Sequence, residues 1–266
     1  MFLKDKAVCA KALTLAIGLV AIAGGNGLSQ AATLPDSTAI PVLFTRTVNA
    51  AKAKPGDTVA AKTLQIVVLP GGQTIPAGTL VVGHVVKSNP FTFDDTDYAI
   101  QKPSALSIHF DKLVEKGAEI PVTLEVRAIS NFTDTNEAST PHYLDETDSV
   151  GTRVLVGGDQ FYPLTKPVTN RDGDVVGYNR KQGVFAKLIS NEAVDRYATF
   201  HCNGTATEQS TAIFSASACG IYGYDTVYMS ENGDKSGGTF TLENRHQTVR
   251  LNAQSAALLQ VIEPQP

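Results

Sequence analysis

Apolar and polar residues alternate most regularly between residues 105 and 113, where the chain reads Ala-Leu-Ser-Ile-His-Phe-Asp-Lys-Leu. Alternation with a period of two places successive side chains on opposite faces of a β-strand. We therefore expect Leu106, Ile108 and Phe110 to face a core. The polar residues of the same strand should lie on its other face: Ser107, His109 and Asp111.

Similar short segments recur along the chain, separated by turns rich in Gly and Pro. We expect strands at residues 40–48, 58–69, 79–86, 120–129, 153–156, 184–189, 222–229, 239–242, 248–251 and 258–262, and a hairpin at 168–178 that turns at Asn170–Asp174. Gly83 lies in the middle of one apolar strand, which predicts a bulge or a close crossing of two backbones. Many short strands between Gly/Pro turns are typical of a β-barrel or sandwich.

Other segments lack this pattern. Residues 89–103 and 130–149 are polar and acidic, which predicts surface loops, and residues 190–197 are expected to form one or two helical turns. Residues 206–220 are rich in Ala and Ser and receive no assignment. The fold class is therefore predicted as all-β, a barrel-like or sandwich domain with a long inserted β-rich region. Residues 32–130 would form the barrel-like half, 131–237 the inserted region and 238–266 the closing strands.

The N-terminus has the features of a cleaved secretory signal peptide over residues 1–31. Lys4, Lys6 and Lys11 precede the uncharged run Ala12–Ala23, and Ser29-Gln30-Ala31 provides small residues at the cleavage site. This order of charge, apolar run and small residues is the signal-peptide pattern. The alternative is a membrane anchor, but the run is shorter than the ~20 apolar residues that a span needs. We expect export to the periplasm or the extracellular space, with no membrane span after cleavage.

The charge of the chain disfavours two classes of partner. Removing the leader removes three Lys and one Asp, so the formal net charge changes from −4 to −6. No cluster of Lys and Arg is evident in the sequence. Nucleic acid and anionic lipid are therefore not expected as partners, because both need concentrated positive charge.

Two cysteines, Cys202 and Cys219, lie outside the leader. In an oxidising compartment such a pair is expected to form one disulfide. Closing that loop would stabilise the fold by ~3 kcal/mol on the chain-entropy model. The alternative is a pair of free buried thiols.

A third possibility is a catalytic cysteine. His201 precedes Ser217-Ala218-Cys219-Gly220 at a spacing similar to that of L,D-transpeptidases, but the His and Gly of that family's motif are replaced. A thiolate nucleophile needs a base or positive charge beside it, and the sequence supplies none. We expect the disulfide rather than a nucleophile.

Residues 56–126 carry a resemblance to a known family. The segments Gly56-Asp-Thr-Val-Ala-Ala-Lys, Ile75-Pro-Ala-Gly-Thr-Leu-Val-Val-Gly-His-Val and Lys116-Gly-Ala-Glu-Ile-Pro-Val resemble the C-terminal β-barrel domain of TrbI-like subunits of conjugation and type IV secretion channels. Residues 239–262 are similar to the last strands of that barrel. The shared motifs are glycines and prolines, which specify turns and not chemistry. The resemblance implies a barrel fold. It leaves channel assembly open, because the family's N-terminal transmembrane anchor, proline-rich stalk and membrane-inserting antenna have no counterpart in the sequence.

No catalytic motif, metal site or cofactor site is predicted. The nucleophile elbow, the zinc-protease motif, the phosphate loop and the dinucleotide fingerprint are all missing from the sequence. His84, His109, His142 and His246 share no ligand spacing.

We expect a non-catalytic structural or interaction module of the cell envelope or extracellular space, whose ligand-binding residues are unknown. The alternative is a protein that binds or processes cell-wall or other polysaccharide through the Tyr residues of the second half, among them Tyr222 and Tyr224. Candidate partners are an envelope protein or a polysaccharide.

Overall fold

The computed structural model describes residues 34–93, 101–143, 150–194, 199–231 and 237–263. About 51% of the chain is strand and about 4% is helix, so the predicted all-β class is confirmed. Residues 31–266 form one compact unit. The signal-peptide region 1–31 lies outside the described residues and stays a prediction.

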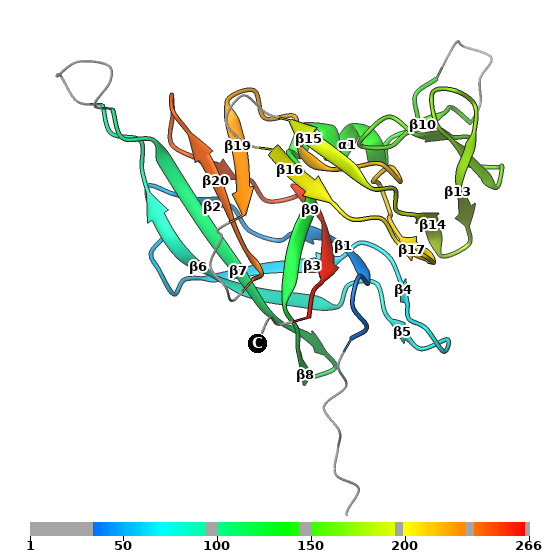
Figure 1. Cartoon of the computed structure of the whole chain (residues 1–266), viewed down its shortest axis with the longest axis horizontal. Helices are drawn as coiled ribbons and strands as arrows, with labels where there is room; N and C mark the ends of the chain where they lie inside the picture. Colours follow the sequence, from blue (N-terminus) through cyan, green and yellow to red (C-terminus); the bar gives the residue numbers. More distant parts are fainter. Residues whose placement is uncertain (1–33, 94–100, 144–149, 195–198, 232–236, 264–266) are drawn as a thin grey trace, which may run out of the picture. The chain divides into compact units, whose positions relative to one another are not determined.

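One large sheet curls into a nearly closed barrel (Figure 1). Its strands follow the order β18 (Gly220–Tyr222), β9 (Leu124–Ser130), β22 (Ala256–Val261), β1 (Ala39–Phe44), β3 (Thr58–Thr63), β6 (Leu80–Asn89), β7 (Ser104–Glu115), β20 (Thr239–Asn244) and β19 (Val227–Glu231), with β8 (Ala118–Pro121) paired to β7. The sheet is antiparallel except where β18 runs parallel to β9. The two edge strands, β18 and β19, follow each other in the chain, so residues 223–226 connect the two edges of the barrel.

The barrel interior is filled by the apolar faces of these strands. Leu106, Ile108 and Phe110 are fully buried, as the alternation predicts. The ring of Phe110 lies 6.3 Å from that of Phe44 and 6.1 Å from that of Phe240. On the opposite face of β7, Asp111 and part of His109 are exposed, but Ser107 is buried and its hydroxyl lies 2.8 Å from that of Thr241. The aromatic cluster anchors the side of the barrel made by β1, β7 and β20.

Gly83 lies at a bulge between β6 and β7 and also lies close to the backbone of β7. The register shifts between Val82 and Gly83. A Cβ at this position would lie 2.2 Å from the carbonyl oxygen of His109. Only glycine allows this approach, so both sequence-based readings, bulge and close backbone contact, are confirmed.

The inserted region forms a second, six-stranded sheet beside the barrel. Its order is β10 (Arg153–Val154), β11 (Gln160–Phe161), β12 (Pro167–Thr169), β13 (Val175–Arg180), β14 (Gly183–Lys187) and β17 (Glu208–Ser210). The hairpin predicted at 168–178 is confirmed by β12 and β13, and the Asn170 side chain accepts hydrogen bonds from the amides of Asp172 and Asp174. Three short pairs complete the fold: β2 (Val48–Asn49) with β21 (Arg250–Leu251), β4 (Val67–Val68) with β5 (Thr74–Ile75), and β15 (Asn191–Val194) with β16 (Thr199–Cys202).

A second apolar core joins the inserted region to the outer face of the barrel. Ala128, Ala256 and Leu258 of the barrel pack with Phe214 and Ala218 of the inserted region. This explains why every residue of β22 is buried: one face lines the barrel and the other is covered by the insertion. Strands covered on both faces need no polar face.

Several sequence-based assignments were wrong. The expected strand 58–69 divides into β3 and β4, and the expected strand 120–129 divides into β8 and β9. The loop predicted at 130–149 contains helix α1 (Phe132–Ser139), whose first turn is capped by the Asn131 side chain accepting from the Asp134 amide at 2.8 Å. Where helical turns were predicted at 190–197, residues 191–194 form strand β15, which pairs with β16, and residues 195–197 lie outside the described residues. The predicted insertion 131–237 also contributes β18 and β19 to the barrel sheet.

In the described part of the chain, no helix has the length and hydropathy that crossing a membrane requires.

Candidate ligand-binding site

Arg127 of β9 fixes the inserted region to the barrel. It is the largest fully buried side chain of the described residues, at 1% exposure. Its Nε donates to the Ala218 carbonyl at 2.9 Å, Nη2 donates to the Ile189 carbonyl at 2.6 Å, and Nη1 donates to the Asn203 carbonyl. Burial lowers the pKa of Arg127 to about 10, although Tyr222 and Glu125 act in the opposite direction. Arg127 therefore stays charged at neutral pH, and its five donors hold three separate loops in place.

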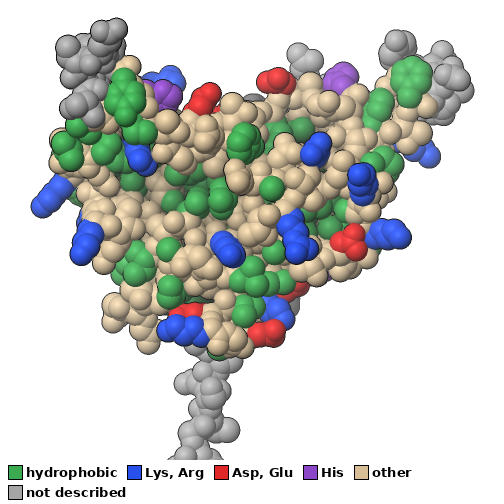
Figure 2. All heavy atoms as spheres, turned by 180° about the vertical axis from the view of Figure 1, so that it is seen from behind, with side chains coloured by type: hydrophobic (Ala, Val, Ile, Leu, Met, Phe, Trp, Pro, Cys, Tyr) green, Lys and Arg blue, Asp and Glu red, His purple; other side chains and the backbone are tan. Residues whose placement is uncertain are grey.

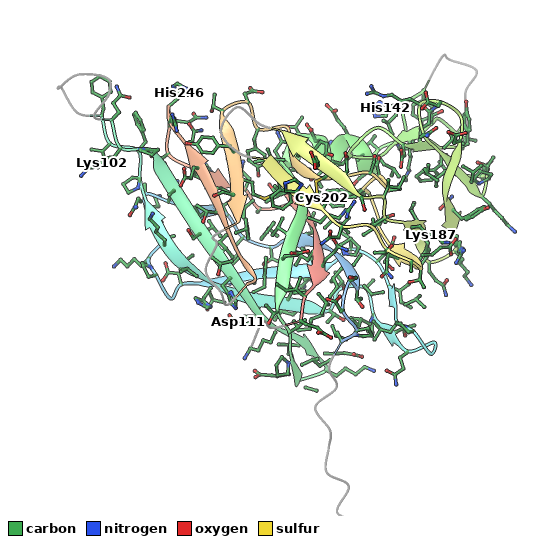
Figure 3. All side chains as sticks on the ribbon, in the orientation of Figure 1. Lys102, Asp111, His142, Lys187, Cys202 and His246 are labelled. Carbon is green, nitrogen blue, oxygen red and sulfur yellow. A yellow bond between two sulfur atoms is a disulfide. The ribbon has the colours of Figure 1, made fainter. Side chains whose placement is uncertain are left out.

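The disulfide predicted between Cys202 and Cys219 is confirmed, with a Cα–Cα distance of 5.9 Å. It lies beside Arg127, because the Cys202 Sγ contacts the Arg127 carbonyl at 3.3 Å. Figure 3 shows Cys202 on β16, where that hairpin approaches the barrel. Neither sulfur is a free thiol, which rules out the cysteine-nucleophile alternative for this state of the protein. His201 instead points to Glu192, with 3.1 Å between Nδ1 and Oε1.

With the loops held in this way, a pocket of about 470 Å³ opens between the inserted sheet and residues 64–65 of the barrel half. We call it the basic pocket. Its positive side chains are Arg153, Arg180 and Lys181, and its apolar wall is formed by Leu64, Leu155, Phe161, Pro163 and Ile213. Among the described residues that line it, none is Asp or Glu. The described lining thus carries three positive side chains and no negative one, in a chain whose formal net charge is −4.

The β13–β14 hairpin places two of the cations. Its turn follows Arg180, and Gly183 takes a φ of 122°, which only glycine adopts readily. The Gln65 side chain fastens the hairpin to the barrel half: its Nε2 donates 2.8 Å to the Val184 carbonyl, and its Oε1 accepts from the Val184 amide at 3.1 Å. The turn that carries Lys181 and Gln182 is therefore held at the rim of the pocket.

The three cations differ in their surroundings. The Arg180 guanidinium pairs with Glu208 and lies 5.4 Å from the centre of the Phe185 ring. In contrast, the Nε of Arg153 is buried without a hydrogen-bond partner. The described residues supply no ion-pair partner for Arg153 or Lys181. A buried donor without a partner costs about 1–3 kcal/mol, so Arg153 has an unmet demand for an acceptor.

A second cleft, of about 460 Å³, lies on the other side of β10 and shares Leu155 with the basic pocket. It is lined by Asp134 and Glu137 of α1, and by His142, Arg171 and Tyr222. Burial first, then the nearby charges of Glu137 and Asp225, raises the pKa of Asp134. The inserted region therefore presents an acidic wall and a basic pocket side by side.

The structure also tests the residues that the sequence singled out. His84 and His109 are half-exposed on neighbouring strands, as expected, and His84 Nδ1 lies 2.9 Å from Asp111 Oδ2. His142 and His246 lie well apart (Figure 3). Within the described ranges no group of three His, Cys, Asp or Glu side chains is arranged to hold a metal ion.

The aromatic residues divide into two groups. Tyr222 and Tyr224 are mostly buried: the Tyr222 hydroxyl accepts from the Cys219 amide at 3.0 Å, and the Tyr224 hydroxyl lies 3.4 Å from that of Ser255. Burial raises the pKa of both phenols. In the inserted sheet, Tyr162 and Tyr178 are 49% and 42% exposed, respectively. Tyr162 and Tyr178 of the inserted sheet are therefore more exposed than Tyr224, and Tyr222 lines the second cleft. The acidic residues Asp94, Asp95 and Asp97 lie outside the described residues.

Sequence reasoning missed the basic pocket. Its cations come from positions 153, 180 and 181, which no local pattern connects. On the face drawn in Figure 2, Lys and Arg side chains are scattered and form no single large patch. The adjacent Arg180-Lys181 pair at a hairpin turn was the one available signal in the sequence.

No protein-family model, curated protein or solved structure matches this chain.

Proposed function

We propose that this protein is an exported, non-catalytic binding module, in which a β-barrel holds a β-rich insertion that binds a ligand or partner of the cell envelope. The observation that supports it most is the basic pocket. Its volume of about 470 Å³ is within the range of small-ligand sites, which are mostly apolar with a few placed polar groups. The resemblance to TrbI-like barrels stays a prediction and carries no part of this argument.

The chemistry of the pocket supports binding over catalysis. The described residues of its wall include no carboxylate, imidazole, hydroxyl or thiol side chain. General acid–base and nucleophilic catalysis both need such groups within hydrogen-bond reach of the reacting atoms. Guanidinium, ammonium and amide groups donate hydrogen bonds and neutralise charge, which suits recognition of an anion.

Export is supported by the leader sequence, and the disulfide between Cys202 and Cys219 is compatible with it. Disulfides form and persist in oxidising compartments. The barrel and its pinned insertion would then act as a rigid support outside the cytosol. A site of this kind loses little conformational entropy on binding, because its walls are already ordered.

Two measurements test the proposal together. The full chain is expressed with its own leader in a bacterial host, and the product should be found outside the cytosol with its N-terminus at Ala32. The purified product is then incubated with envelope material. Retention should fall for the double variant Arg153→Gln/Lys181→Gln and stay unchanged for Lys166→Gln, which alters an exposed lysine outside the pocket. A cytosolic, uncleaved product, or retention that ignores the pocket variant, would contradict the proposal.

A further inference from the structure

We propose that the basic pocket binds an acidic saccharide, with the carboxylate of one sugar unit held by Arg153 and Lys181. The inference rests on the proposed binding function and names the ligand class of that same pocket. It is argued from the charge of the pocket, from the unpartnered guanidinium and from the character of the remaining wall.

The charge of the pocket selects an anion. A cation in a recess is screened less by solvent than one on an open surface, so its attraction for an anion is stronger. Arg180 already has Glu208 as its partner. Arg153 and Lys181 have no such partner among the described residues, so they are the two cations that a ligand would neutralise.

The guanidinium of Arg153, which lines the pocket, narrows the choice to an oxyanion. Guanidinium presents parallel N–H donors that match the two oxygens of a carboxylate. A carboxylate in the pocket would accept from the Nη groups of Arg153, because the Nε itself is buried away from solvent. Lys181, on the flexible stem typical of lysine, can reach the same anion from the hairpin turn.

The rest of the wall favours a sugar over an acidic peptide. Sugar rings have apolar C–H faces and a rim of hydroxyls. An apolar surface for the ring faces is formed by Phe161, Pro163 and Ile213. The exposed amide of Gln182 can form hydrogen bonds with the hydroxyls. An acidic peptide would present carboxylates to the same cations but no sugar-like ring face to Phe161 and Pro163, so it serves as a comparison ligand in the test.

The experiment measures binding of trigalacturonate to the disulfide-intact mature protein by calorimetry at low salt. Maltotriose, which has the same number of rings without carboxylates, and triglutamate, which has the carboxylates without rings, serve as comparison ligands. We expect trigalacturonate to bind at least about tenfold more tightly than either one, and its affinity to fall as salt is added. Equal binding of maltotriose would overturn the role of the carboxylate, and equal binding of triglutamate would overturn the sugar.

Variants locate the site. Arg153→Gln and Lys181→Gln should each weaken trigalacturonate binding by about tenfold or more, because each removes a charge-assisted hydrogen bond to the carboxylate. Lys166→Gln, the control with the same loss of charge, should change affinity by less than about twofold. Far-ultraviolet circular dichroism checks that each variant is folded. Unchanged affinity in both pocket variants would overturn the assignment.

The outcomes separate this inference from the proposed function. If trigalacturonate does not bind but envelope retention still depends on Arg153 and Lys181, the binding module stands and the saccharide is wrong. If retention is also independent of these residues, the proposed function fails as well.

Discussion

Replacing Arg127 with methionine tests how the inserted region is held on the barrel. Methionine keeps a long unbranched side chain in the buried space but provides no donor. The substitution would leave the carbonyls of Ala218, Ile189 and Asn203 without the guanidinium that now donates to them. If these loops have no other way to satisfy those carbonyls, they must rearrange or separate from the barrel.

The expected loss of stability follows from these contacts. A hydrogen bond to a charged group contributes about 1.5–3 kcal/mol, and three of them would sum to about 4.5–9 kcal/mol. Two terms reduce this sum. The Asn203 and Ile189 bonds are only partly buried, so water can replace the lost donor. Removing the guanidinium also removes the cost of burying its charge, which is the cost that lowers the pKa of Arg127 to about 10. We expect a net loss of about 3–5 kcal/mol, which is the sum of the hydrogen-bond contributions reduced by these two effects.

Urea-induced unfolding at pH 7, followed by circular dichroism, measures this change. Arg127→Lys should lose less unfolding free energy than Arg127→Met, because the lysine ammonium can still donate to one or two of the three carbonyls. Arg171→Met, an exposed arginine on the β12–β13 turn, is the matched control and should change stability by less than about 0.5 kcal/mol. Hydrogen exchange in residues 199–219 should speed up in Arg127→Met. If Arg127→Met is as stable as the Arg171 control, the claim that Arg127 holds the insertion is wrong.

Three further predictions concern other parts of the molecule. Cys202→Ser/Cys219→Ser should lower the unfolding free energy by ~3 kcal/mol on the chain-entropy model, measured by urea unfolding; a loss below about 1 kcal/mol would contradict it. Gly83→Ala should lower the unfolding free energy by more than about 2 kcal/mol, since its Cβ would lie 2.2 Å from a backbone oxygen of β7. Gly72→Ala has open space around it, so it should lower the unfolding free energy by less, through the strain of its positive φ alone. Burial raises the pKa of Asp159 above its ordinary value. The native state therefore binds this proton more tightly than the unfolded state does. As the pH falls from 7 towards 4, the unfolding free energy of the wild type should rise relative to that of Asp159→Asn. A stability difference between the wild type and Asp159→Asn that does not change with pH would refute the raised pKa of Asp159.

The sequence by itself determined the local geometry of the barrel. Alternation over residues 105–113 is a property of one strand, so it identified the buried face of β7 without knowledge of its neighbours. Gly83 could be assigned to a bulge for the same reason, because the constraint is the missing Cβ. The disulfide followed from two cysteines and a leader sequence. All of these inferences depend on a few neighbouring residues or on composition.

The tertiary structure alone decided which strands pair, and therefore where a pocket lies. Strand β9 runs directly after β8 but pairs with β22 and β18, and nothing in residues 118–130 indicates those distant partners. The helical turns predicted at 190–197 are not formed at residues 191–194, because these residues pair with β16. In the sequence, Arg127 is a polar residue in a largely apolar strand. It becomes buried and donates hydrogen bonds to three loops only because the insertion folds over β9. The basic pocket arises in the same way, since Arg153 and Lys181 become neighbours of one cavity only after the inserted sheet has formed.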